Sequence, residues 1–159
     1  MEYRNKARFL ANSSNFVEWP ADAFLSDHTP LVLGVYGDYR FGTELADMLR
    51  RISVRGHPIE LRWVRKEENL RWCHVLFVSR SEEKNYAKVL DALSGASVLT
   101  VGETASFLDA GGAVILAVAG DDLHFEVNLA ATDRARLKVS SHLLALAQRV
   151  VRKSPVAKS

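Results

Sequence analysis

The chain has 159 residues, 48% of them hydrophobic and 25% charged, and its net charge is only +2. This length and composition predict a single globular domain over residues 1–159. So small a net charge does not support nucleic-acid binding, which relies on a strongly basic surface.

The sequence also limits the protein's relation to membranes and to disulfide chemistry. No apolar run reaches the ~18 residues that a membrane-spanning helix needs, so we expect no direct insertion into a membrane. The longest run, residues 113–119, has the length of a strand. No signal peptide is visible at the N-terminus, which taken alone favours the cytoplasm. Cys73 is the only cysteine, so an intramolecular disulfide is excluded.

The first third of the chain predicts a helix, a buried strand and a second helix. Residues 3–17 carry apolar side chains at helical spacing, and the pattern ends at Trp19, because a residue before proline leaves the helical region. Residues 31–36 form a continuous apolar run, which is typical of a strand covered on both faces. Thr43 is the expected N-cap of a helix whose apolar stripe runs to Ile52.

Strands and helices alternate through the middle of the chain. Residues 59–63 alternate apolar and charged side chains, which predicts a half-exposed strand at a sheet edge, and a short helix over 66–72 follows. Residues 75–78 predict a fully apolar strand, and residues 98–101 predict another strand. Between them Ser79 is the expected N-cap of a helix that ends at Gly95, with Glu82 completing a capping box.

The last third of the chain completes an α/β pattern. A short helix over 103–110 and a strand over 114–118 precede a turn, after which residues 123–127 return as an antiparallel hairpin strand. Helices are expected over 130–137 and 141–151, and the basic segment 152–159 is interpreted as a frayed tail. The whole predicts a three-layer α/β/α domain, with a mostly parallel sheet of about five strands plus an antiparallel edge hairpin strand.

The expected strand ends are the first place to look for a ligand. In open α/β sheets, ligands bind beyond the carboxyl ends of the strands, where helix N-termini present free N–H groups to anions. Either these loops hold a small anionic ligand, or they are tight turns with solvated charges. The candidate ligand-binding residues are Gly37, Asp38, Arg40, Gly42, Ser79, Arg80, Gly102 and Glu103.

The catalytic motifs that the sequence approaches lack the residues that their chemistry requires. Gly37 and Gly42 have the spacing of a phosphate-binding loop, but Thr43 stands where that loop requires lysine. Ser79 occupies the place where a receiver-like domain would carry its phosphorylated aspartate. None of the five histidines has a partner at metal-ligand spacing. We therefore predict a protein that is not an enzyme, with no catalytic residue, no metal and no cofactor.

An aromatic segment near the N-terminus has two interpretations. Phe16, Trp19 and Phe24, with Glu18 among them, form a contact surface for a partner protein, since aromatic side chains are enriched at interface hot spots. Alternatively, these side chains pack the first helix onto the sheet. The sequence alone leaves both interpretations open.

Eight short motifs, taken in order, resemble the YfiR-like family of small exported bacterial proteins. The resemblance extends from about residue 6 to residue 150, which is nearly the whole chain. The motifs are FVEWP at 16–20, PLVLGVYGD at 30–38, FG at 41–42, CHVLFVS at 73–79, VLTVG at 98–102, GG at 111–112, FEVNLAA at 125–131 and SSHLL at 140–144.

The resemblance implies a non-catalytic regulatory domain that binds other proteins. It implies a periplasmic repressor of a membrane-bound diguanylate cyclase, itself controlled by an outer-membrane-associated partner, with a homodimer as a possible assembly. Because the family is exported, we expect an export signal to have preceded Met1. Some relatives carry disulfides, and this chain with its single Cys73 departs from them. The alternative function is a soluble sensor that binds a small anion at the strand ends.

Overall fold

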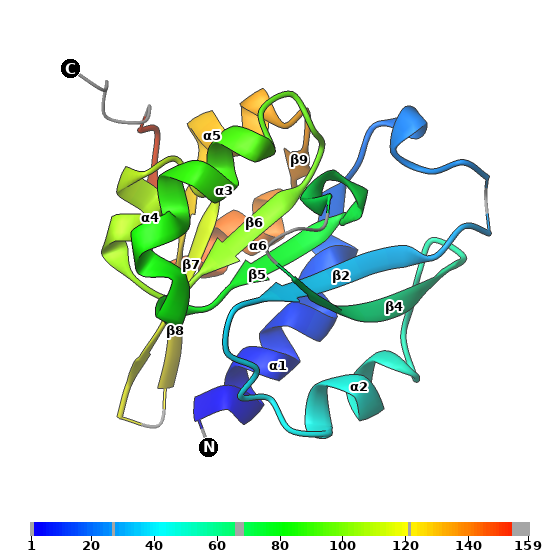
Figure 1. Ribbon diagram of the computed structural model, residues 1–159, viewed down its shortest axis with the longest axis horizontal. Helices are drawn as coiled ribbons and strands as arrows, with labels where there is room; N and C mark the ends of the chain where they lie inside the picture. Colours follow the sequence, from blue (N-terminus) through cyan, green and yellow to red (C-terminus); the bar gives the residue numbers. More distant parts are fainter. Residues whose placement is uncertain (1, 27, 66–68, 121, 154–159) are drawn as a thin grey trace.

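The computed structural model describes residues 2–26, 28–65, 69–120 and 122–153. In this part of the chain, eight strands form one sheet in the order β10-β8-β7-β6-β5-β2-β4-β3, and helices cover both of its faces (Figure 1). The strands are β2 Leu31–Tyr36, β3 Ser53–Val54, β4 His57–Val64, β5 Val75–Val78, β6 Leu99–Gly102, β7 Val114–Ala119, β8 Asp122–Asn128 and β10 Arg149–Val151.

Six α-helices connect and cover these strands within the described ranges. They are α1 Glu2–Ser13, α2 Glu44–Leu49, α3 Tyr86–Ala92, α4 Ala105–Asp109, α5 Leu129–Arg134 and α6 Ser141–Leu146. Short 3₁₀ turns occupy Ser14–Phe16, Ala21–Ala23, Leu70–Trp72 and Arg80–Asn85, and β1 Val17–Glu18 pairs antiparallel with β9 Lys138–Val139 beside the main sheet.

Alternate side chains of the central strands enter two separate cores. On β2, Leu33 and Val35 point to the face covered by α1 and α2, while Val32 points to the face covered by α3 and α4. The run Val75–Val78 divides in the same way, and all four of its residues are buried. A strand buried on both faces must be apolar at every position, which is why these runs were recognisable in the sequence.

The predicted three-layer domain with a mostly parallel sheet is confirmed. Strands β4, β2, β5, β6 and β7 are parallel neighbours. The hairpin is also confirmed, since β8 runs antiparallel to β7 with Leu116 opposite Phe125. The chain reverses its direction of travel across the sheet between β2 and β5, so the loops after these two strands meet at the switch point.

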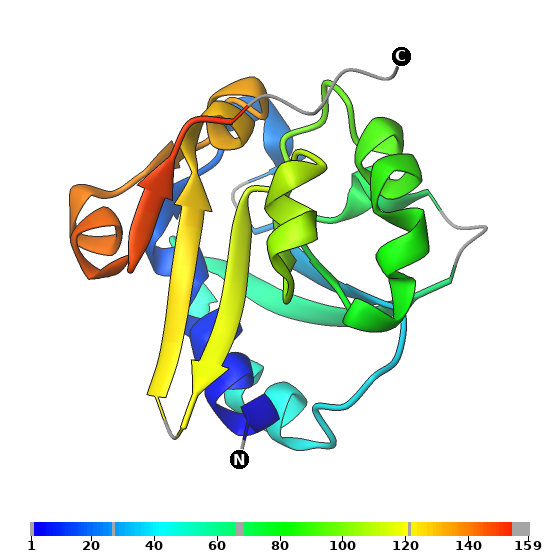
Figure 2. The same ribbon diagram turned by 90° about the vertical axis from the view of Figure 1, so that its left-hand side faces the viewer.

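The expectation of one helix over residues 141–151 is wrong. Helix α6 ends at Leu146, Ala147 adopts an extended conformation, and β10 then pairs in parallel with β8 (Figure 2). The pattern misled because residues 149–151 lie at helical spacing from Leu143, whereas β-branched Val150 and Val151 favour a strand when a free edge is available. The hairpin strand β8 is therefore not at the edge of the sheet.

Several local predictions also need correction. The first helix ends at Ser13 instead of residue 17, because residues 17 and 18 pair with β9. Thr43 lies before α2, but its side chain makes no cap hydrogen bond. Ser79 does cap, accepting from the Ser81 N–H at 3.3 Å. The short helix expected over 66–72 is a 3₁₀ turn at Leu70–Trp72, and residues 66–68 lie outside the described ranges.

The C-terminal segment begins with two residues that the structure holds against the domain. Arg152 pairs with Asp133 at 2.8 Å and Lys153 pairs with Asp109 at 3.2 Å. Residues 154–159, the rest of the expected tail, lie outside the described part of the chain. None of the helices in the described ranges is long and apolar enough to span a membrane.

The buried strands should dominate stability. Leu33 is fully buried in β2, so Leu33→Ala should lower the free energy of unfolding by about 2–5 kcal/mol, the usual cost of a core cavity. Leu25→Ala is the matched control, because Leu25 is 98% exposed and its truncation should change stability by less than about 0.5 kcal/mol. Urea denaturation measures both, and equal midpoints for the two variants would contradict this assignment of the core.

Candidate functional site

The predicted ligand residues meet at the carboxyl ends of β2, β5 and β6. Gly37 follows β2 with φ of 101°, and a Cβ at this position would lie only 2.9 Å from the Ser79 Cβ. The Asp38 N–H donates to the Ser81 hydroxyl at 3.0 Å. The loops after β2 and β5 therefore touch, as the parallel arrangement of these strands requires.

Glu103, which follows β6, is the centre of this site. One carboxylate oxygen accepts from the Lys6 ammonium at 2.7 Å and from the Tyr3 hydroxyl at 2.8 Å. The other accepts from the Arg80 backbone N–H at 2.8 Å, and the Arg80 Nε lies 3.6 Å away. The side chains of Lys6 and Glu103 are 1% and 0% exposed, so the ion pair is shielded from water.

Lys6 is the residue that sequence analysis missed. It lies on α1 three residues after Tyr3 and four before Leu10, in the same stripe that the helix buries against the sheet. Glu2, one turn earlier, also accepts from its ammonium at 2.5 Å. A lysine inside an otherwise apolar stripe was the available signal, because a buried ammonium requires a carboxylate partner.

The pKa values in this cluster follow from burial and hydrogen bonding. Burial alone would raise the pKa of Glu103, but the hydrogen bonds from Lys6, the Arg80 N–H and Tyr3 together hold that pKa below its usual value. Burial, together with the hydrogen bond to the Glu103 carboxylate, raises the pKa of Tyr3 to about 12. The cluster is thus a carboxylate held ionised by fixed donors.

In the predicted anion site, the arginine side chains already pair with carboxylates of the chain itself. The Arg80 N–H and guanidinium are bonded to Glu103 and to Glu2, the latter at 2.9 Å. Arg40 pairs with Asp38 at 3.8 Å, and both side chains are more than half exposed. Gly42 and Gly102 do not form an anion-binding loop with the described residues around them. Gly42 faces open space, and a Cβ at Gly102 would lie 2.4 Å from the Phe107 ring. An entering anion would compete with the chain's own carboxylate.

A second cluster lies at the opposite end of the sheet, where the aromatic segment crosses it. The Phe24 ring is stacked between His57 and His74, with ring centroids 3.9 and 4.3 Å away and interplanar angles of 17° and 9°. The Trp19 indole N–H donates to the His74 carbonyl at 3.1 Å. Two of the predicted contact residues therefore anchor the segment to the sheet.

His74 holds a defined tautomer within this stack. Its Nδ1 accepts from the Val32 N–H at 2.9 Å, so its Nε2 must carry the proton that bonds the Ala23 carbonyl at 2.8 Å. Burial lowers the pKa of His74 below its ordinary value. The ring is therefore neutral in the folded protein at neutral pH.

The other two predicted contact residues lie at the base of the same segment. Phe16 is half-buried, with its ring 5.4 Å from the His142 ring, and Glu18 is exposed, 3.9 Å from the Arg55 guanidinium. Beyond Phe24 the chain presents Leu25, which is 98% exposed. A groove of about 450 Å³ is lined by this loop together with Val54, Arg55 and His57.

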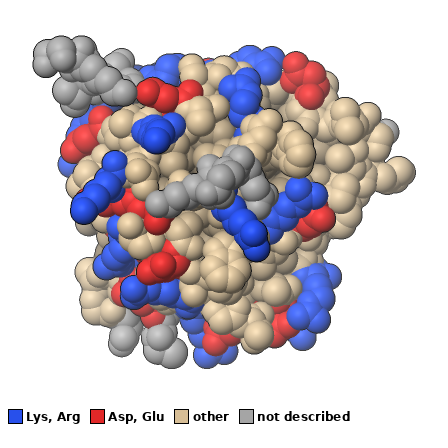
Figure 3. All heavy atoms as spheres, viewed as in Figure 1, with Lys and Arg blue, Asp and Glu red and all other residues tan. Residues whose placement is uncertain are grey.

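The surface around this loop differs from the rest of the visible face. Acidic and basic side chains are interspersed over most of that face, whereas the projection at the right is mainly uncharged (Figure 3). In Figure 1 the same projection is the loop that precedes β2. No group of three or more His, Cys, Asp or Glu side chains placed to hold a metal occurs among the described residues.

Comparison with known proteins identifies the family. A family model described as YfiR/HmsC-like matches residues 3–148. The chain belongs to the YfiR/HmsC-like family. The resemblance found in the sequence is thereby confirmed.

Two solved structures share the fold of this YfiR/HmsC-like chain. A conserved domain protein from Vibrio cholerae O1 biovar El Tor aligns over 93% of the chain with a TM-score of 0.60 and 11% identity. The ABC domain in complex with L-Trp from Streptococcus pneumoniae aligns over 94% with a TM-score of 0.59 and 6% identity. The chain spans 60% of the length of each, and at such identities the similarity concerns the fold alone.

Removing one partner of the buried ion pair should destabilise the protein strongly. Glu103→Gln should cost about 3 kcal/mol, the lower end of the usual range because Glu2 remains beside Lys6. Adding Lys6→Met should recover much of this loss, since no buried charge is then left unpaired. A double-mutant cycle by urea denaturation measures the coupling, and strictly additive losses would contradict it.

The same variant should alter stability in acid. The pKa of Glu103 is lower in the folded than in the unfolded state, so its contribution is complete above the reference value of 4.5 and is lost as the pH falls through the folded value. Glu103→Gln should lack this part of the acid dependence. Unfolding curves between pH 5 and pH 2 test it.

His74 should make stability sensitive to mild acid. Its folded pKa lies below the reference 6.5, so its contribution is complete above that pH and is lost as the pH falls towards the folded value. His74→Asn retains an acceptor for the Val32 N–H but cannot titrate, so it should lose less stability between pH 7.5 and 5. His28→Asn, at an exposed position, is the control. If the wild type, His74→Asn and His28→Asn lose the same stability between pH 7.5 and 5, a group other than His74 causes the loss.

Proposed function

We propose that this YfiR/HmsC-like protein represses a membrane-bound diguanylate cyclase by docking onto its external domain in the periplasm. Membership of the family supports a regulator of this kind. The regulatory contact is proposed to be made with a protein surface. The protein is proposed to act by binding, without catalysis of its own.

The observation that carries the proposal is the exposed Leu25 on an anchored loop. Apolar surface marks an interaction site where it is contiguous, and the exposed Leu25 lines the same groove as Trp19 and Phe24. Phe24 beside it is clamped between two imidazole rings, so little loop entropy is lost on binding. The groove of about 450 Å³ behind the loop provides a recess for an apolar side chain of the cyclase.

The proposed surface includes Glu18 and Trp19 as its rim, whereas Phe16 does not line the groove. Glu18 and Trp19 line the groove together with Arg55. A homodimer, implied by the resemblance, is proposed as the docking form, and its mass in solution can be measured by light scattering. The alternative function, an anion sensor at the strand ends, gains no separate support, because Glu103 and Glu2 already engage Arg80.

Cellular cyclic-di-GMP tests the function. Deleting the full-length gene should raise cyclic-di-GMP, and the wild-type gene should restore it, whereas a version that lacks its export signal should not. Leu25→Asp should fail to complement while leaving stability unchanged, because the side chain is 98% exposed.

Leu146→Asp is the matched control for this experiment. Leu146 is 60% exposed on α6 and does not line the groove beside Leu25, so the variant should complement like wild type. Full complementation by Leu25→Asp would remove the loop from the interface. Unchanged cyclic-di-GMP after deletion, or complementation by a cytoplasmic version, would overturn the function itself.

A further inference from the structure

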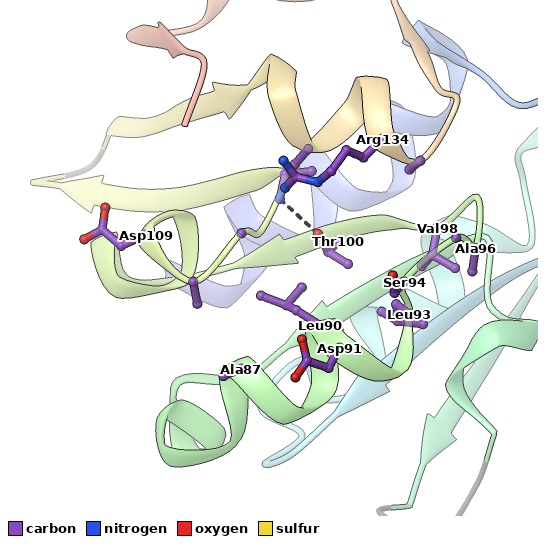
Figure 4. A pocket seen from close by; sticks show the side chains of 16 residues that line it. Ala87, Leu90, Asp91, Leu93, Ser94, Ala96, Val98, Thr100, Asp109 and Arg134 are labelled. Atoms are coloured by element: carbon purple, nitrogen blue, oxygen red, sulfur yellow. Dashed lines mark hydrogen bonds between the residues drawn. The ribbon is translucent and has the colours of Figure 1, made fainter. Parts of the chain in front are cut away.

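A cavity of about 670 Å³ opens on the α3 face of the sheet, and neither Glu103 nor Leu25 lines it (Figure 4). Val98 and Thr100 form its floor at the start of β6, whereas Glu103 follows the end of the same strand. Leu90 of α3 and Leu93, which follows this helix, line one side, and Ala131 of α5 lines the other. Its volume lies within the roughly 300–1,000 Å³ typical of small-molecule sites.

The cavity exists because the elements around it carry small side chains. Alanine or glycine occupies half of the lining positions, so α3 and α5 leave open the space that larger residues would fill. The polar group in the floor is already used, since the Thr100 hydroxyl accepts from the Ala113 N–H at 2.9 Å. An occupant must therefore bury a mainly apolar body.

Arg134 gives this apolar cavity a charge. It projects from α5 towards the cavity mouth, and it has no hydrogen bond or ion pair within the described part of the chain (Figure 4). The neighbouring cations are engaged: Arg71 donates to the Ser94 carbonyl at 2.6 Å, and Lys153 pairs with Asp109. Arg134 is thus available to pair with an incoming anion, which a guanidinium can bind with two N–H groups.

The acidic residues of the rim restrict the occupant further. Asp91 and Asp109 lie at the rim on the α3 and α4 side of the cavity (Figure 4). Asp109 is already paired with Lys153, so a second anionic group on a ligand would find no cation besides Arg134 among the described residues that line the cavity. The charges thus favour one anionic group, placed on the α5 side.

We propose that this cavity binds a small amphiphile, with an apolar body between α3 and α5 and a single anionic group paired with Arg134. The inference is independent of the docking loop, which lies on other elements. It also differs from the predicted anion site at the strand ends, where the arginine already has a carboxylate partner. A ligand here would bridge helices on two sides of the cavity and stabilise their relative position.

Two dyes that differ by one charge test the proposal. 8-Anilinonaphthalene-1-sulfonate has an apolar body and one sulfonate, and N-phenyl-1-naphthylamine is nearly the same body without charge. Fluorescence titration of the folded protein should show saturable binding of the sulfonate at one site. Arg134→Gln should weaken it by about tenfold or more and leave the neutral dye unaffected, because only the charged hydrogen bonds are lost.

Two further variants locate the dye. Arg136→Gln removes a nearby exposed arginine that pairs with Asp22, so it should leave both affinities unchanged. Ala135→Leu adds bulk at a half-buried lining position and should weaken both dyes. Thermal melts confirm that each variant is folded. No saturable binding, equal sulfonate affinity in wild type and Arg134→Gln, or unaltered binding in Ala135→Leu would overturn the proposal.

Discussion

The buried ion pair between Lys6 and Glu103 is the constraint on which the arrangement of this domain depends. A carboxylate and an ammonium that are removed from water must each find partners, and here they find each other, the Tyr3 hydroxyl and the Arg80 N–H. These contacts connect the first turns of α1 to the loops that follow β5 and β6. They hold the first turns of α1 against these loops, and its apolar stripe covers one face of the sheet.

The same interaction explains why the strand ends differ from those of ligand-binding α/β domains. Their free N–H groups normally attract an anion from solution. In this chain the Arg80 N–H is satisfied from within, by a side chain that also neutralises a buried lysine. The carboxyl ends of β5 and β6 thus contribute to the stability of the fold through this side chain.

The opposite end of the sheet carries the features proposed for recognition. Phe24 is held between His57 and His74, so the adjoining Leu25 is presented on an anchored loop. The Arg134 cavity lies on a different face, between α3 and α5. Because the two sites share no lining residue, each can be altered by substitution without disturbing the other.

What the sequence by itself determined is the pattern that depends on local order. The apolar runs of β2 and β5, the β7–β8 hairpin and the family motifs are all readable, because strand period, turn residues and motif order are properties of neighbouring residues. The pairing of strands across the sheet cannot be read from the sequence in this way. Residues 149–151 became a strand only because β8 offered a free edge, which no local pattern reveals.

Only the tertiary structure decided the chemistry of the sites. Lys6 and Glu103 are 97 residues apart in sequence, and so their pairing had to wait for the fold. Phe24 meets two histidines from different strands, and the exposure of Leu25 follows from that contact. That the Arg134 guanidinium has no partner among the described residues is equally invisible in the sequence, because whether a charge has a partner depends on which distant residues the fold brings beside it.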